Sequence, residues 1–283
     1  MSPPRNAPAA LSAGEQRSNT RGKDPATIGE KGETWMLSCG CLNMVSLPPS
    51  SLFGGNGRFL QIVPVNAEVF VMAHEDERLR RLMETTVNTV DGRVLRWICM
   101  LLYPRKQIVL LKGANFIYDL AGFCQSRGER LFLLGSNERS NAGAVAKLRA
   151  AYPGLDVSGF GPPLSQSPFD WPCRRIILER IETHRPHHLG VCFGPAKQEF
   201  WIQQNAQELS KIGVRCAYGL GGTIDFLSGS LRRAPRWVDR VGAEWLFRFL
   251  CEPRRRWFRT LIQFKMPFYA AKTRRLIKPL LSL

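Results

Sequence analysis

The spacing of hydrophobic and polar positions becomes regular from about Arg58 onward. Short runs of β-branched and apolar residues alternate there with segments whose apolar residues recur at helical spacing. The expected strands are FLQIVPV (59–65), TVNTV (86–90), KQIVLLKG (106–113), RLFLLG (130–135), LDVSGF (155–160), HLGVCFG (188–194) and VRCAYGLGG (214–222). This alternation indicates stacked βα units, so we expect an α/β fold with a Rossmann-like parallel sheet flanked by helices.

Helical spacing fills the intervals between these runs. The expected helices cover Ala67 to about Glu84, Arg93 to about Tyr103, FIYDLAGFCQ (116–125), AVAKLRAAY (144–152), Arg174 to about Thr183 and KQEFWIQQNAQEL (197–209). In an open α/β sheet the ligand binds beyond the carboxyl ends of the strands. The residues that follow each expected strand are therefore candidates for a site.

Glycines and polar residues gather at that predicted edge. They are Asn66, Asp91 with Gly92, Gly113, Gly135 with Ser136, Gly159 with Gly161, Gly194 with Lys197, Gln198 and Glu199, and Gly219 with Gly221 and Gly222. Glycine lets backbone amides approach an anion such as a diphosphate, although glycines also end strands for local reasons. Taken together with the interleaved polar side chains, the set favours a polar ligand.

Asp91 directly follows an expected strand, and Gly92 allows the chain to turn after it. A carboxylate in that place can take a proton from an attacking hydroxyl. The alternative is that Asp91 caps the helix that begins near Arg93. No Asp-x-Asp motif occurs, so we expect no metal cofactor and expect arginines or backbone amides to stabilise a leaving diphosphate.

The net charge of +17 is concentrated near the C-terminus. Residues 230–283 hold fourteen Lys and Arg against three acids, so residues 1–229 carry only 17 − 11 = +6. Residues 1–33 are rich in Ser, Pro, Gly and charge and lack an apolar run, and we expect residues 1–50 to be a disordered tail. The eight cysteines lack the regular spacing of a disulfide or zinc framework, so we expect the protein to reside in a reducing cytoplasm.

Three weaker motifs have ordinary explanations. GLGGTID is an incomplete dinucleotide-binding motif and lies at the last expected strand instead of the first. His184, His187 and His188 lack a partner at metal-ligand spacing, so we expect a surface turn there. Cys39 and Cys41 are expected to be ordinary thiols.

The segment 246–283 is expected to form a basic, amphipathic helical appendage after the α/β domain of residues 58–245. Apolar residues at 257, 258, 261, 262, 268 and 269 fall near helical spacing, with cations between them, as in a helix that lies on an anionic membrane surface. The alternatives are an ordinary packed helix with a solvated basic face and a nucleic-acid-binding tail.

Two stretches, GPAKQEFWI (194–202) and GLGGTIDFLSGSLRRAPRWVDRVGAEWLFRFLCEPRRR (219–256), resemble the WecG/TagA/CpsF family of bacterial glycosyltransferases. The shared elements are G-x-x-K-Q-E-x-W-I, G-G with an acid three residues on, R-A-P-x-W, E-W-x-x-R and E-P-x-R, in order. Upstream, VNAEVF (65–70) and VDG (90–92) also fit. The resemblance covers roughly residues 58–260.

This resemblance implies an inverting, metal-independent enzyme that transfers a hexose-type sugar from a UDP donor. The sugar in the family is N-acetylmannosamine, its uronic acid or a glucose-type unit. The implied acceptor is a polyprenyl-diphosphate-linked glycan used for bacterial surface polysaccharide. The implied location is the cytoplasm, with the enzyme bound peripherally to the inner face of the cytoplasmic membrane. No nucleic acid is expected as a partner, and a homo-oligomer is compatible with the sequence.

The resemblance also assigns roles to residues. Asp91 matches the general base, Asn66 a pocket residue beside it, and Gln198 a donor-side contact. Arg248 and Arg255 match arginines that reach the diphosphate. The further residues expected to bind substrate are Gly92, Lys112, Gly113, Gly194, Lys197, Glu199, Gly221 and Gly222.

Several positions depart from the family pattern, among them a third C-terminal arginine, near whose place Phe258 stands between Arg256 and Arg259. Pro64 stands where the family usually has threonine. Before the position of Gly113 the family commonly has an arginine, and this chain offers only Lys112 there, at a displaced position. The proline of the K-Q-E turn is shifted to Pro195, which leaves Ala196 in its place.

Overall fold

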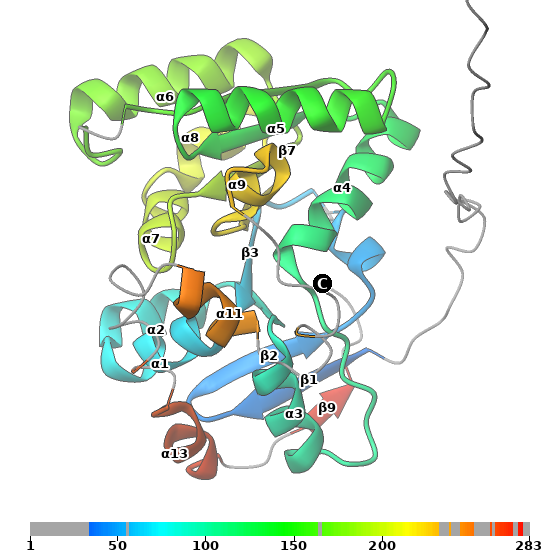
Figure 1. Ribbon diagram of the computed structural model, residues 1–283, viewed down its shortest axis with the longest axis vertical. Helices are drawn as coiled ribbons and strands as arrows, with labels where there is room; N and C mark the ends of the chain where they lie inside the picture. Colours follow the sequence, from blue (N-terminus) through cyan, green and yellow to red (C-terminus); the bar gives the residue numbers. More distant parts are fainter. Residues whose placement is uncertain are drawn as a thin grey trace, which may run out of the picture. The chain divides into compact units, whose positions relative to one another are not determined.

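The fold is known from a computed structural model that describes residues 34–54, 57–163, 166–231, 238, 244–251, 261, 264–273 and 277–279. The strands in this part of the chain are β1 (Trp35–Cys39), β2 (Leu42–Ser46), β3 (Leu60–Val65), β4 (Val87–Val90), β5 (Leu131–Gly135), β6 (Val157–Phe160), β7 (His188–Cys192), β8 (Cys216–Gly219) and β9 (Ile277–Pro279). They form one sheet in the order β6-β5-β7-β8-β3-β4-β2-β1-β9 (Figure 1). From β6 to β2 every described pairing is parallel.

Helices cover both faces of the sheet. They are α1 (Ala67–Glu75), α2 (Glu77–Met83), α3 (Arg93–Leu102), α4 (Gly113–Arg127), α5 (Glu138–Ala151), α6 (Trp171–His184), α7 (Lys197–Gln204), α8 (Ala206–Ile212), α9 (Thr223–Ser228), α11 (Glu244–Cys251) and α13 (Met266–Ala271), with a 3-10 turn η1 (Pro49–Leu52). On β3, Ile62 packs with α4, α5 and α9, whereas Val63 and Val65 pack with α1, α2 and α3. Successive strand residues point to opposite faces, so β3 joins two cores.

The predicted α/β class with a parallel, helix-flanked sheet is confirmed. Two predicted elements differ in detail. The segment 106–112 is not a strand, although the Leu111 amide donates to the Val90 carbonyl at 2.8 Å. The helix expected over 67–84 is divided at Asp76, whose carboxylate accepts from the amides of Arg78 and Leu79 and so begins α2.

The expected disordered tail over residues 1–50 is wrong for its last part. Residues 35–46 form the antiparallel hairpin β1–β2, and Val45 of β2 pairs in parallel with Thr89 of β4. Gly40 sits in the turn with φ 58°. The hairpin is ordered because its residues Leu37, Leu42 and Met44 are buried against α1 and α2. Residues 1–33 lie outside the described part of the chain.

The C-terminal segment is also more integrated than expected for a separate appendage. Met266 and Ala270 of α13 are buried in the core that contains α1, and β9 pairs antiparallel with β1. Most residues between α11 and α13 lie outside the described part, so the amphipathic helix predicted there stays a prediction. Within the described residues, no helix is long and apolar enough to cross a bilayer.

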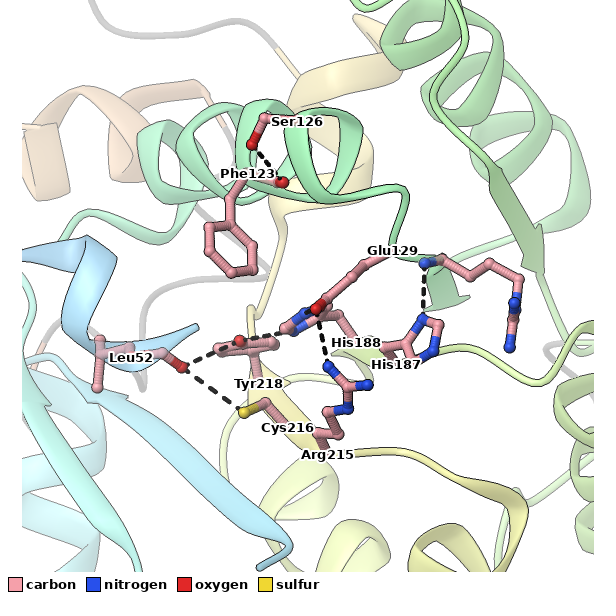
Figure 2. A network of polar contacts seen from close by, with 10 residues as sticks. Leu52, Phe123, Ser126, Glu129, His187, His188, Arg215, Cys216 and Tyr218 are labelled. Atoms are coloured by element: carbon pink, nitrogen blue, oxygen red, sulfur yellow. Dashed lines mark hydrogen bonds and ion pairs between the residues drawn. The ribbon is translucent and has the colours of Figure 1, made fainter. Parts of the chain in front are cut away.

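A polar network lies at the amino ends of β7 and β8 (Figure 2). His188, expected in a surface turn, is fully buried as the first residue of β7. Its Nε2 lies 2.6 Å from Glu129 Oε2, and its Nδ1 lies 3.0 Å from the Tyr218 hydroxyl. Arg215 donates to the other oxygen of Glu129 at 2.7 Å. The acidic partner of His188 thus comes from a distant part of the sequence.

Burial lowers the pKa of His188 and outweighs the opposing influence of Glu129, so the imidazole is neutral at neutral pH. Burial by itself raises the pKa of Glu129, but the bonds from His188 and Arg215 outweigh it and lower the pKa overall. With Nε2–H donating to the Glu129 carboxylate, Nδ1 is an acceptor, and the single Tyr218 hydroxyl proton faces both Nδ1 at 3.0 Å and the Leu52 carbonyl at 3.3 Å.

Glu129→Gln should destabilise the fold by about 1–3 kcal/mol at pH 7, because charge-assisted bonds to His188 and Arg215 are lost. The lowered pKa of Glu129 means that its contribution is present above about pH 4 and disappears as the pH falls through its folded pKa. Urea unfolding at several pH values should show the difference from wild type shrinking in acid. Glu179→Gln, which breaks an exposed pair with Arg175, is the control and should change little. Equal effects of the two variants would contradict the prediction.

Candidate active site

The register of the central strands brings the expected site residues together. Val65 of β3 pairs with Val90 of β4, so the next residues, Asn66 and Asp91, leave neighbouring strands at the same level. On the other side of β3, Ile62 pairs with Tyr218 of β8. The carboxyl ends of three adjacent parallel strands therefore border one space.

A pocket lies in that space. Of the residues expected from the sequence, it is lined by Asn66, Asp91, Lys112, Gly113, Gln198, Gly221 and Gly222. It is also lined by Pro64, Val69, Pro195, Gly219, Leu220, Thr223 and Phe226. Seven of the candidates, drawn from five separate segments of the chain, thus share one cavity.

Asn66 and Asp91 reach the pocket in different local settings. Asn66 is the N-cap of α1, and its side-chain oxygen accepts from the Val69 amide at 3.0 Å. This bond fixes the side chain and leaves the amide nitrogen of Asn66 as the group for a ligand. Gly92, with φ 85°, is the N-cap residue of α3, so Asp91 stands one residue before the N-cap position that the alternative gave it.

Gln198 is held between two segments of the chain. Its side-chain oxygen accepts from the Gly221 amide at 3.0 Å, and its nitrogen donates to Glu199 Oε1 at 2.8 Å. A Cβ at Gly219 would lie 2.7 Å from the Gln198 nitrogen and 2.9 Å from Glu199 Oε1. Glycine at the end of β8 therefore makes room for these two side chains.

Glu199 lies behind Gln198 instead of facing the pocket. It is 1% exposed, and its Oε2 has no hydrogen-bond partner among the described residues. Burial raises the pKa of Glu199 to about 7, although the Gln198 amide and nearby backbone amides oppose the shift. A sequence motif could identify this carboxylate but could not show that it supports a neighbour.

The other candidates lie elsewhere or outside the described residues. Gly194 has φ 88° and precedes Pro195 of the pocket, and Lys197 is exposed at the start of α7. Arg248 belongs to α11, but its side chain is outside the described part of the structure. Arg255 lies outside the described residues altogether. Their roles at the diphosphate stay predictions.

Glycines at the ends of β5 and β6 are explained by internal packing. A Cβ at Gly135 would lie 2.7 Å from the Cys192 carbonyl, and one at Gly161 would lie 2.5 Å from the backbone of Asn137. At Gly159 the clash would be with the side chain of Asn141. These glycines allow close contacts within the protein, as the local explanation supposed.

Sequence reasoning missed several apolar and small residues of the pocket. Thr223 and Phe226 follow Gly222 in α9, and the Thr223 hydroxyl donates to the Leu220 carbonyl at 2.6 Å. Their position just beyond the last strand could have placed Thr223 and Phe226 at the site from the sequence. Pro64 and Pro195, noted only as departures from a family pattern, also line the pocket.

The pocket combines a carboxylate, two carboxamides, an ammonium group and glycine backbone, from Asp91, Asn66, Gln198, Lys112 and Gly221. Carboxamides suit sugar hydroxyls, a cation suits a phosphate, and a carboxylate can accept a proton. Such a set is suited to a polar ligand that carries negative charge and a hydroxyl group that gives up its proton.

The sequence is similar to those of known proteins. Residues 51–278 match the model of the Glycosyl transferase WecG/TagA/CpsF family. One relative is the N-acetylglucosaminyldiphosphoundecaprenol N-acetyl-beta-D-mannosaminyltransferase of Bacillus subtilis (strain 168), which is 30% identical over 160 residues. That match covers 56% of this chain and 57% of the relative, so the chain spans little more than half of the relative's length. The family match, which extends over most of the chain, shows that this protein belongs to the WecG/TagA/CpsF family of glycosyl transferases.

Proposed function

We propose that the protein is an inverting, metal-independent glycosyltransferase that uses a UDP-sugar as donor. The sugar is a hexose-type unit, such as N-acetylmannosamine, its uronic acid or a glucose-type sugar. The acceptor is a polyprenyl-diphosphate-linked saccharide in bacterial surface polysaccharide synthesis. Family membership supports glycosyl transfer, and the name of the Bacillus subtilis relative supports a lipid-linked acceptor. The observation that carries the proposal is the meeting of Asp91, Asn66 and Gln198 in one pocket.

Asp91 is the proposed general base. Its carboxylate takes the proton of an acceptor hydroxyl while that oxygen attacks the anomeric carbon and the bond to the diphosphate breaks. Direct attack from the face opposite the leaving group inverts the anomeric centre, as in other single-displacement reactions on sugars. The position after β4 supports this role, because the rigid sheet fixes the carboxylate at the pocket.

The leaving UDP diphosphate needs positive charge. Lys112 lines the pocket, and Arg248 and Arg255 are the further cations that the family motif brings to this role. Because no Asp-x-Asp motif is present to hold a divalent ion, we assign the charge stabilisation to these cations and to glycine backbone amides.

Gln198 is the proposed donor-side contact, and Glu199 is the residue that positions it. Since the Gln198 nitrogen donates to Glu199 and its oxygen accepts from Gly221, the carboxamide cannot flip without losing both bonds. One N–H of the carboxamide is then left for the donor.

The protein is further proposed to act in the cytoplasm, bound peripherally to the inner face of the membrane, where its acceptor resides. The basic C-terminal residues support this through attraction to anionic lipid. A nucleic-acid-binding role, the other interpretation of that basic segment, would leave Asp91, Asn66 and Gln198 without a purpose.

Asp91→Asn should lower sugar transfer by about 10²- to 10⁴-fold, because the amide cannot accept the hydroxyl proton. Binding of the UDP-sugar should be nearly unchanged, since the shape of the side chain is kept. UDP release in the presence of a polyprenyl-diphosphate-linked acceptor measures transfer, and calorimetry measures donor binding. Asp170→Asn, at an exposed carboxylate, is the matched control. Undiminished turnover of Asp91→Asn would rule out Asp91 as the base.

Glu199→Gln should remove a pH-dependent loss of stability. The pKa of Glu199 is about 7 when folded and about 4.3 when unfolded, so the folded state binds more protons between these values. Wild-type stability should therefore fall by up to about 3 kcal/mol as the pH rises from about 5 to about 8. Unfolding of the variant should show a flatter pH profile, and exposed Glu182→Gln should keep the wild-type slope. If stability changed with pH equally in Glu199→Gln and in wild type, the raised pKa of Glu199 would be contradicted.

Arg255→Ala should lower transfer by about 10²- to 10³-fold without lowering the melting temperature, if Arg255 stabilises the leaving diphosphate. Substitution is preferable to truncation, because removal of residues 254–283 would also remove α13 and β9 from the fold. Arg175→Ala, at an exposed side chain of α6, is the control and should keep full activity. Normal transfer by both Arg248→Ala and Arg255→Ala would exclude these arginines from the site.

A further inference from the structure

Helix α3, which begins two residues after Asp91, carries apolar residues on two sides. Leu95 and Cys99 are buried in the core, whereas Trp97, Met100 and Leu101 are 46%, 41% and 79% exposed. The last three, here called the α3 face, are neighbours on one side of the helix because residues three and four apart lie side by side. A solvated helix ordinarily places polar residues there, so the α3 face is unusual for a surface in contact with water.

The surroundings of the α3 face are cationic. No acidic residue occurs between Asp91 and Asp119 in the sequence, whereas five Lys and Arg do. Arg105 is exposed just after the helix, and the Lys106 ammonium lies 3.2 Å from the centre of the Trp35 ring. An apolar surface with cations beside it is complementary to a partner with an apolar interior and an anionic surface.

Helix α13 contacts the same hairpin as α3. Tyr103, at the end of α3, donates to the Ser38 carbonyl of β1, and the Gly40 amide beyond β1 donates to the Thr273 hydroxyl beyond α13, both at 2.7 Å. Both helices are therefore tied to the β1–β2 hairpin near its Gly40 turn. On α13, Phe268 is exposed, with the Lys272 ammonium 4.2 Å from its ring centre.

We propose that the α3 face, together with Phe268 of α13, docks on an anionic lipid bilayer. Trp97, Met100 and Leu101 enter the boundary between headgroups and acyl chains, while Arg105 and Lys272 meet the lipid phosphates. A second copy of this chain is a poorer occupant, because a two-fold contact would bring the same cations together, and Glu75 beside α13 already pairs with Lys265 at 2.6 Å. The α3 face, and not only the C-terminal tail, is thus a membrane contact.

This docking has a consequence for the site. The same helix that meets the bilayer starts beside Asp91, so a lipid-linked acceptor would be presented close to the proposed base. The inference extends the proposed function, whose acceptor is lipid-linked, but it rests on the surface chemistry of α3. Vesicle binding needs neither donor nor acceptor, so a failure here is distinguishable from a failure of the transferase proposal.

The test is vesicle flotation with the full-length chain. The vesicles contain mixed phosphatidylglycerol and phosphatidylcholine, or phosphatidylcholine alone. Wild type should float with the anionic vesicles and bind the neutral ones more weakly. Trp97→Gln and Leu101→Gln should each weaken binding about tenfold, because each removes an apolar side chain that would leave water. Since both side chains are exposed, the melting temperatures should stay unchanged.

Trp171→Gln is the matched control. Trp171 is 64% exposed but belongs to α6, at the opposite end in Figure 1, and its loss should not affect vesicle binding. Unchanged binding by the Trp97→Gln/Leu101→Gln double variant would overturn the proposal, as would an equal loss in Trp171→Gln. Sedimentation without vesicles provides a further check. A dimer that the double variant dissociates would show that a second copy covers the α3 face, and would also overturn it.

Discussion

The parallel pairing of β3 with β4 on one side and with β8 on the other is the constraint on which the site depends. Because Val65 pairs with Val90, the side chains of Asn66 and Asp91 must emerge next to each other. Because β8 runs in the same direction, its following glycines close the space from the other side. A shift of one residue in either pairing would turn the strand faces over and separate these groups.

The two ends of the sheet use buried polar groups differently. At the amino ends, His188, Glu129 and Arg215 satisfy one another, and the network fastens β7 and β8 to the loop before β5. At the carboxyl ends, Glu199 keeps one oxygen without a hydrogen-bond partner among the described residues and holds Gln198 at the edge of the pocket. A satisfied network stabilises the fold, whereas a buried carboxyl with an unpaired oxygen behind a pocket is typical of functional sites, where local rules of stability are broken.

Helix α3 links the proposed chemistry with the proposed location. Its first turn follows the base, its inner side packs on the sheet, and its outer side offers apolar groups among cations. The net charge of the chain is concentrated near the C-terminus, but the packing of α13 and β9 shows that part of this segment belongs to the body of the fold. The membrane surface that we propose therefore combines residues from two distant parts of the sequence.

Apart from the strand expected at 106–113, the βα units, the parallel sheet and the pocket positions of Asn66, Asp91, Gln198 and Gly221 followed from the sequence, because strand and helix periods are local and parallel strands end at one edge. The hairpin at residues 35–46 and strand β9 did not follow, since their partners lie far along the chain. The partner of His188 was hidden for the same reason. Only the tertiary structure separated the glycines that border the pocket from those that allow close packing, because that distinction depends on which atoms a Cβ would meet.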